Sequence, residues 1–304
     1  MKTSGRIKIL FLFGAIFVAS AWTGLRAQTD MYYNAALHFL QVAEVDSAKA
    51  QVDLMLKQPD AQKDPDNWYL YGVVYKEMYK KYEVKNVNSP YRLTAYNAFK
   101  TSVSMDTVTA RKKITRDNIR FLAGKFYNDA VVTLDTTQYE TSVACYKEYR
   151  EAALIADPGG VDTTKKDAEF DLALASTYNA IYNNNKKKNA KFFDLTRDTY
   201  MKVLAADANN YTANYNLGLL YWNKGVDLMY EIDFDDSLNS IFQTQDNSVD
   251  LFKQSLPFAE KAYVIEPKRE ETLIVLSGIY YSLNEFDKSK AYQQMLDELR
   301  KTPH

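Results

Sequence analysis

The chain has 304 residues, and its 38 Lys and Arg nearly balance its 39 Asp and Glu, which gives a formal net charge of −1. This balance offers no bulk electrostatic attraction to nucleic acid or to an anionic membrane. With 10 Gly and 7 Pro the composition is unlike that of a loop-rich or disordered chain, and the single cysteine excludes an internal disulfide. We therefore predict a mostly helical chain that is held together by helix packing.

The first 27 residues have the pattern of a secretory signal peptide. Three basic residues up to Lys8 precede an apolar run from Ile9 to about Ala21, and the small residue Ala27 follows. The alternative is a retained membrane anchor, but residues 9–25 are only 17 long, whereas a membrane-spanning helix needs about 20. We expect cleavage after residue 27, which leaves residues 28–304 without an integral membrane span.

Export would place the mature protein in a bacterial cell envelope, with the periplasm as the main expectation and the outer membrane as the alternative. No cysteine follows the apolar run, so the sequence lacks a site for lipid attachment there.

Residues 32–59 have the spacing of two short helices. Tyr32, Ala36 and Phe39 recur at helical intervals. After a turn and restart at residues 45–48, Val52 continues an apolar face toward Pro59. This stretch is the first predicted helix pair.

Residues 67–99 carry the clearest motif of the chain. They read Trp68-x2-Tyr71-Gly72-x2-Tyr75 and then Ala95-x3-Phe99. This stretch resembles the tetratricopeptide repeat (TPR), whose pattern is W-x2-L-G-x2-Y followed by A-x3-F, with Tyr71 in place of the Leu. Apolar residues continue at helical spacing after Tyr75, so we expect the first helix to run on for two turns and the connection to lie near residues 86–90.

The same pattern returns in four further units, each with a small residue in its first helix. The six markers are Ala36, Gly72, Gly124, Ala175, Gly218 and Gly278. We expect the second helix of each unit to cross the first closely at the marker, because a large side chain would push them apart. Asp157-Pro-Gly-Gly160 ends the third unit, the polar residues 183–189 form the loop of the fourth, and residues 225–250 are an insertion in the fifth.

The resemblance covers about residues 32–300 and implies an all-α fold. The expected domain, residues 28–304, is a right-handed α-solenoid of about six TPR-like helix hairpins with lengthened helices or insertions. The resemblance also implies a non-catalytic protein–protein interaction scaffold that binds a peptide or a partner protein of the envelope in a concave groove. It leaves the identity of the partner and the oligomeric state open.

No residue pattern points to catalysis, to a cofactor or to a metal. His38 and His304 are far apart and have no cysteine or carboxylate at metal-ligand spacing. Cys145 lies on a predicted helix beside two tyrosines, where a buried thiol is expected rather than a nucleophile. Residues 231–236 alternate like part of a calcium loop, but the required glycine and distal glutamate are missing. We therefore predict no enzyme activity. An enzyme is the less favoured alternative, because the 39 acidic residues offer many carboxylate pairs and the sequence singles out none of them.

The 24 tyrosines divide into two sets. Five occupy the same repeat position, where the family uses an aromatic residue to pack the helix pair: Tyr75, Tyr127, Tyr178, Tyr221 and Tyr281. Other aromatic and polar residues fall on the face of the first helices that lines the groove in the family. The predicted groove residues are Tyr33, Tyr69, Phe121, Lys125, Asn128, Asn179, Tyr215, Leu219 and Trp222.

Two alternatives to a protein-binding groove stay open. The groove residues could pack against inserted segments instead, or the surplus aromatics could bind carbohydrate or peptidoglycan. The insertion, with Met229, Tyr230, Ile232, Phe234 and Phe242 among acidic residues, is a second candidate contact.

A short motif, Asp followed by Ser or Thr and then an apolar or Thr residue, occurs five times in expected turns. It resembles the acceptor motif for O-glycosylation in some Gram-negative envelope proteins and marks Ser47, Thr107, Thr136, Thr163 and Ser237. The alternative is ordinary helix capping, for which Asp, Ser and Thr are the preferred residues.

Overall fold

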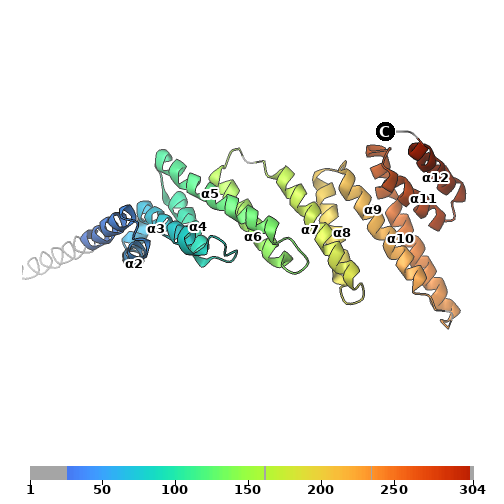
Figure 1. Ribbon diagram of the computed structural model, residues 1–304, viewed down its shortest axis with the longest axis horizontal. Helices are drawn as coiled ribbons and strands as arrows, with labels where there is room; N and C mark the ends of the chain where they lie inside the picture. Colours follow the sequence, from blue (N-terminus) through green and yellow to red (C-terminus); the bar gives the residue numbers. More distant parts are fainter. Residues whose placement is uncertain (1–25, 161, 234, 302–304) are drawn as a thin grey trace, which may run out of the picture. The chain divides into compact units, whose positions relative to one another are not determined.

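The computed structural model describes residues 26–160, 162–233 and 235–301, and these are helical with short connections and no strand (Figure 1). They divide into two compact units. The first comprises residues 26–132 and 140–160, and the second comprises residues 133–139 and those from 162 onward. The predicted signal peptide lies almost entirely outside the described residues.

The first unit contains three helix pairs. Residues 26–41 pair with α2 (Val45–Met55), and a short 3-10 turn (Ala61–Lys63) leads into the second pair. There α3 (Pro65–Met78) continues as a π-helical turn (Tyr79–Glu83) and packs on α4 (Pro90–Met105). The third pair is α5 (Thr109–Val132) with α6 (Tyr139–Ala156). The prediction that the first helix of the second pair runs on is confirmed.

The second unit also contains three helix pairs. They are α7 (Thr164–Asn184) with α8 (Lys191–Ala206), α9 (Tyr211–Tyr230) with α10 (Leu238–Ile265), and α11 (Glu270–Ser282) with α12 (Phe286–Lys301). The all-α architecture of consecutive helix hairpins, as in an α-solenoid, is thus confirmed. The predicted break at residues 157–160 and the loop that follows α7 are confirmed as well.

Side-chain caps explain where several helices begin. The Asp64 carboxylate accepts a hydrogen bond from the Asp66 N–H (2.9 Å), and Pro65 occupies the first helical position of α3. Ser89 caps α4 in the same way, followed by Pro90. Both arrangements satisfy free N–H groups at the helix start and place proline where its missing N–H does no harm.

The shortest turns of the chain share one backbone device. Ala43 and Asn284 are the non-glycine residues with positive φ among those described, at 61° and 60°. At each turn the N–H of the next residue bonds back to the carbonyl five residues earlier: Glu44 to Phe39 (2.8 Å) and Glu285 to Tyr280 (2.9 Å). A helix that ends with one residue in the left-handed conformation can be followed directly by the next helix.

Close helix crossings occur at three of the glycine markers. A methyl group added to Gly72 would lie 2.7 Å from the Phe99 ring of α4, and one added to Gly218 would lie 3.0 Å from the backbone N of Ala259 in α10. At Gly278 the added group would strike the Trp222 ring of α9, so the closest contact there is with the preceding hairpin and not, as predicted, with the second helix of its own unit. Small residues at these sites therefore let the helices approach.

The marker in the third unit was placed at the wrong residue. A methyl group on Gly124 would meet no atom within 4 Å, and Gly124 is exposed. The adjacent Ala123 is buried instead, so the true crossing lies one residue earlier.

The predicted packing tyrosines also need one correction. Tyr75 and Tyr178 are buried, and Tyr127 and Tyr221 are half-buried against aromatic rings of their partner helices. Tyr281, however, is 65% exposed, and the neighbouring Tyr280 is buried and stacks on Tyr292 of α12. The prediction for Tyr281 is therefore wrong by one residue. As at Gly124, the residue directly before the predicted one is the buried one.

Most of the expected insertion in the fifth unit is helical. The interval 225–250 is formed by the last turns of α9 and the first turns of α10, with only a short connection between Tyr230 and Leu238. Across these helices the Phe252 ring packs against Gly225. None of the helices in the described residues combines the length and the hydrophobicity needed to cross a bilayer.

Candidate functional site

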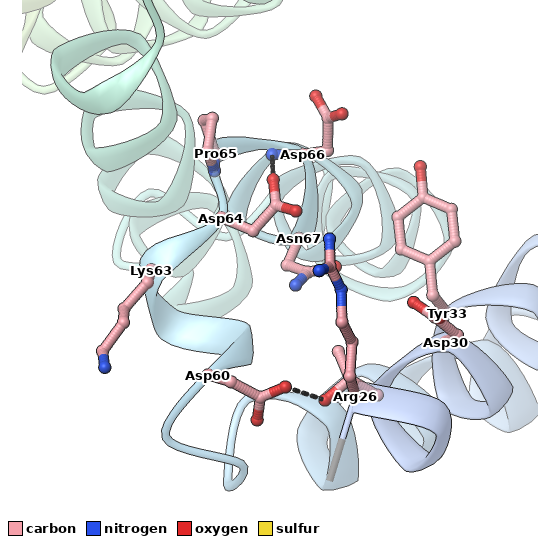
Figure 2. A pocket seen from close by; sticks show the side chains of 10 residues that line it. Arg26, Asp30, Tyr33, Asp60, Lys63, Asp64, Pro65, Asp66 and Asn67 are labelled. Atoms are coloured by element: carbon pink, nitrogen blue, oxygen red, sulfur yellow. Dashed lines mark hydrogen bonds between the residues drawn. The ribbon is translucent and has the colours of Figure 1, made fainter. Parts of the chain in front are cut away.

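A cleft in the first unit brings two of the predicted groove residues together. Its larger hollow, about 630 Å³, lies between the helix of residues 26–41 and the start of α3, and is shown in Figure 2. A smaller hollow of about 260 Å³ adjoins it and reaches α4 and α5. Tyr33 and Asp66 line both hollows, and Tyr69 lines the smaller one.

The 3-10 turn before α3 forms one wall of the cleft, and two side chains hold it in place. The Asn67 amide donates to the carbonyl of Ala61 (3.1 Å), and the Trp68 indole donates to the carbonyl of Gln62 (2.9 Å). Both donors lie in the first turn of α3, so the turn and the helix form one rigid element. This fixes the positions of Asp60 and Asp64 relative to α3.

An ion network crosses the smaller hollow. The Arg111 guanidinium of α5 lies 2.6 Å from Asp66 and 3.2 Å from Asp106. Asp106 is buried at the end of α4, where its carboxylate also accepts from the Val108 N–H (2.8 Å). This network connects α3, α4 and α5 around the hollow.

Tyr33 keeps its phenol proton in this setting. Burial raises its pKa above the ordinary value, and the negative charges of Asp66 and Asp64 raise it further. The Tyr33 side chain therefore presents an apolar ring and a hydroxyl group that can donate a hydrogen bond.

The cleft carries an excess of negative charge. Its carboxylates are Asp30, Asp60, Asp64, Asp66 and Asp106, and its basic residues are Arg26, Lys63 and Arg111. In Figure 2 the Lys63 side chain points away from Tyr33. Cleavage after residue 27 would also remove Arg26. The Oδ1 atom of Asp60 is buried and finds no hydrogen-bond partner among the described residues, whereas its Oδ2 atom accepts from Thr29 (3.2 Å).

The other predicted groove residues lie elsewhere. In the first unit Phe121 is exposed on α5 with the Lys125 ammonium 5.5 Å from its ring centre, and Asn128 is exposed one turn further along. In the second unit Asn179 bonds with Asn183 on α7 (3.2 Å).

Three predicted groove residues of α9 are partly buried within the second unit. Tyr215, Leu219 and Trp222 pack on the hydrophobic cluster that α10 and α11 form. The Trp222 indole also donates to the Ser282 hydroxyl (3.2 Å). Packing against a neighbouring helix thus accounts for their apolar surfaces, and a binding role for them stays a prediction.

The acidic and basic residues of the cleft were not predicted from the sequence as site residues. Asp60, Asp66, Asp106 and Arg111 stand at helix ends, where charged residues are common and carry no distinctive signal. The Asp64-Pro65 pair, typical of a helix start, is a signal that could have indicated where α3 begins. Only the fold brings this helix start beside residues 26–33 and the start of α5.

The five candidate glycosylation residues differ in accessibility. Thr107 and Thr136 are exposed in connections, and Ser47 lies half-buried in the first turn of α2. Thr163 is buried, and its hydroxyl donates to Asp167 (2.9 Å). Ser237 caps α10 by accepting from the Ser240 N–H (3.3 Å). Capping thus accounts for Ser237, and modification of these residues stays a prediction.

The residues considered for chemistry lie apart. Cys145 is buried on α6, and burial raises the pKa of its thiol, which disfavours the reactive thiolate. His38 is exposed on the helix of residues 26–41, and His304 lies outside the described residues. Within the described part of the chain no group of three or more His, Cys, Asp or Glu side chains is arranged to hold a metal ion.

Comparisons with known proteins give no family assignment. No protein-family model matches the chain, and no curated protein matches it. Among solved structures, a monomeric mutant of IFIT1 with Gppp-AAAA matches 87% of this chain and 58% of its own, at 12% identity and a TM-score of 0.32. The chain therefore spans little more than half of that protein. The TPR domain of P58(IPK) matches 89% of this chain and 92% of its own, at 12% identity and a TM-score of 0.21.

Proposed function

We propose that this protein is a non-catalytic scaffold of a bacterial cell envelope that binds an extended segment of a partner protein in the cleft of its first unit. The observation that carries the proposal is the cleft itself, in which Tyr33 and Tyr69 lie beside five carboxylates. Aromatic side chains offer large apolar contact areas, and carboxylates bind cationic groups. The expected segment carries an apolar residue next to Lys or Arg.

The cleft is suited to this role because its walls are preformed. Side-chain hydrogen bonds from α3 fix the 3-10 turn, and the Arg111 network ties α5 to α3 and α4. A binding surface that is already ordered loses less conformational entropy when the partner binds. The Asp60 carboxylate, which lines the cleft, would attract an incoming ammonium or guanidinium group.

Export to the periplasm belongs to the proposal and is supported by the pattern of residues 1–27. Cell fractionation of the native host tests it, and mass spectrometry of the purified protein tests cleavage after Ala27. A protein that stays in the cytoplasm with Met1 at its N-terminus would contradict this part.

Affinity purification of the tagged protein from its own envelope tests the binding role. We expect a specific protein to co-purify. The amount captured by the Tyr33→Ala/Tyr69→Ala variant should be lower by a factor of about ten or more. The conservative Asp60→Asn variant keeps the side-chain shape and should weaken the same capture. Tyr82→Ala is the matched control, because Tyr82 is exposed in the same unit and lies outside the cleft.

Undiminished capture by both cleft variants would contradict the proposal. Binding to purified peptidoglycan without any protein partner would favour the carbohydrate alternative instead.

A further inference from the structure

The α9–α10 hairpin extends beyond the helix that covers it on one side. Ser282, the last residue of α11, lies level with Trp222 of α9, because the Trp222 indole donates to its hydroxyl group. Helix α9 continues to Tyr230, so residues 223–230 add about 12 Å at a rise of about 1.5 Å per residue. In Figure 1, α10 runs past the ends of α11 and α12 at this end of the hairpin. We refer to residues 225–233 and 235–252 as the α9–α10 extension.

The other side of the extension is covered by the preceding hairpin. Lys186, in the loop between α7 and α8, lies 2.5 Å from Asp227, and Lys187 lies 4.0 Å from Glu231. The α7–α8 loop therefore reaches the end of α9, whereas α11 stops about two turns short of it. The extension is open on the side of α11.

Large apolar side chains of the extension face solvent. Tyr230 is 86% exposed, Leu238 is 70% exposed and Phe242 is 58% exposed, and Met229 at the end of α9 is also exposed. Leu238 and Phe242 are four residues apart and so lie on one face of the first turns of α10. Exposed apolar side chains gathered in this way mark interaction sites in soluble proteins.

The extension also carries a strong local negative charge. It contains seven carboxylates and no Lys or Arg, in a protein whose net charge is −1: Asp227, Glu231, Asp233, Asp235, Asp236, Asp246 and Asp250. The lysines of the α7–α8 loop lie against Asp227 and Glu231, and Lys253 lies 3.8 Å from Asp250, so only some of these charges are offset. An apolar patch rimmed by carboxylates is complementary to a surface that combines apolar and basic residues.

We infer that the α9–α10 extension is a second docking surface, whose occupant is a cationic amphipathic segment of a partner protein. The apolar face of the segment covers Tyr230, Leu238 and Phe242, and its Lys or Arg side chains face the surrounding carboxylates. A second copy of this chain would bring like charges together in a symmetric contact, and an anionic membrane would be repelled.

A synthetic peptide tests this inference directly. The probe is a labelled amphipathic helix of about 15 residues composed of Leu and Lys, titrated into the full chain and followed by fluorescence anisotropy. We expect binding that weakens at higher salt, and a loss of about tenfold or more in the Leu238→Ser/Phe242→Ser variant. Val264→Ser is the matched control, because Val264 is exposed on the same helix outside the extension.

Further arms separate the possible occupants and sites. A peptide with Gln in place of Lys should bind with an affinity that is lower by a factor of about ten or more. The Tyr33→Ala/Tyr69→Ala variant should bind the Lys peptide unchanged, which distinguishes this surface from the cleft. Sedimentation of the full chain should show the same oligomeric state with and without the Leu238→Ser/Phe242→Ser change.

Four outcomes would overturn the inference. They are no binding of the Lys peptide by the unmodified chain, equal binding by the Leu238→Ser/Phe242→Ser variant, equal binding of the Gln peptide, and loss of binding in the cleft variant instead. Conversion of a dimer to a monomer by Leu238→Ser/Phe242→Ser would identify a second copy as the occupant and would also overturn it.

Discussion

Ala43 adopts a backbone conformation that is unfavourable for its side chain. Its φ of 61° closes the turn between the helix of residues 26–41 and α2, where glycine is the usual residue. Asn284 closes the equivalent turn before α12, and asparagine tolerates this conformation better than alanine does. The two turns therefore have the same geometry but a different conformational cost.

Ala43→Gly should stabilise the protein. Relief of the left-handed strain outweighs the entropy that glycine adds to the unfolded chain, and we expect a gain of about 0.5–1 kcal/mol in the free energy of unfolding. Urea unfolding followed by circular dichroism measures this change. Asn284→Gly is the control and should change stability by less. A loss of stability in Ala43→Gly would show that this turn is not strained.

Tyr200 makes stability depend on pH in alkaline solution. Burial raises its pKa from 10.0 to about 12. The folded state thus holds the phenol proton more tightly than the unfolded state, so the stabilisation is complete below pH 10 and is lost as the pH rises toward 12. The expected slope is about 1.4 kcal/mol per pH unit for this residue.

The comparison of unfolding free energies at pH 9 and pH 11 tests this expectation. Tyr200→Phe should reduce the alkaline loss while leaving other tyrosines with a raised pKa, such as Tyr75 and Tyr211, to titrate. An identical pH profile for Tyr200→Phe would exclude Tyr200 as a contributor.

At the scale of the helices, packing requires a small residue only where two helices cross closely. Gly218 lies against the backbone of Ala259, whereas Gly124 has open space around its Cα atom. Alanine favours a helix over glycine by up to about 1 kcal/mol when nothing obstructs the methyl group. The two glycines should therefore respond to the same substitution in opposite directions.

Gly124→Ala should raise the free energy of unfolding by up to about 1 kcal/mol, and Gly218→Ala should lower it by about 1–2 kcal/mol. Chemical denaturation of the two variants side by side is the measurement. Equal stabilisation of both would mean that α9 and α10 do not cross closely at Gly218.

The hairpin pattern could be predicted from the sequence because small and aromatic residues recur at matching positions of different repeats. Gly72 and Tyr75 of the second unit, for example, correspond to Gly218 and Tyr221 of the fifth. The register could not be predicted where two similar residues are adjacent. Ala123 and Gly124 are both small, and Tyr280 and Tyr281 are identical. One step along a helix turns a side chain by about 100°, so only the position of the neighbouring helices decides which member of each pair is buried.

The helical extension and the cleft could not be predicted from the sequence either. Residues 225–250 depart from the repeat pattern and were interpreted as an insertion, although their helices simply run on. The cleft depends on contacts between residues that are distant in sequence, such as Asp66 and Arg111. A single sequence without such contact information contains no signal for it.

At the scale of the whole molecule, the proposed function depends on surfaces that the hairpins leave open. Many apolar residues of the hairpins are buried among the helices, and both proposed binding surfaces lie where hairpins end or differ in length. The cleft of the first unit lies at the ends of several helices, and the α9–α10 extension exists because two helices are longer than the next pair.

The central claim is that a partner protein lies against Tyr69 when it is bound. Photo-crosslinking in the native host tests it most directly, with a benzophenone amino acid placed at position 69 and, as a control, at position 82. We predict that irradiation joins the chain to a specific envelope protein from position 69 and gives no adduct from position 82. The absence of an adduct from position 69, or an equally strong one from position 82, would contradict the account.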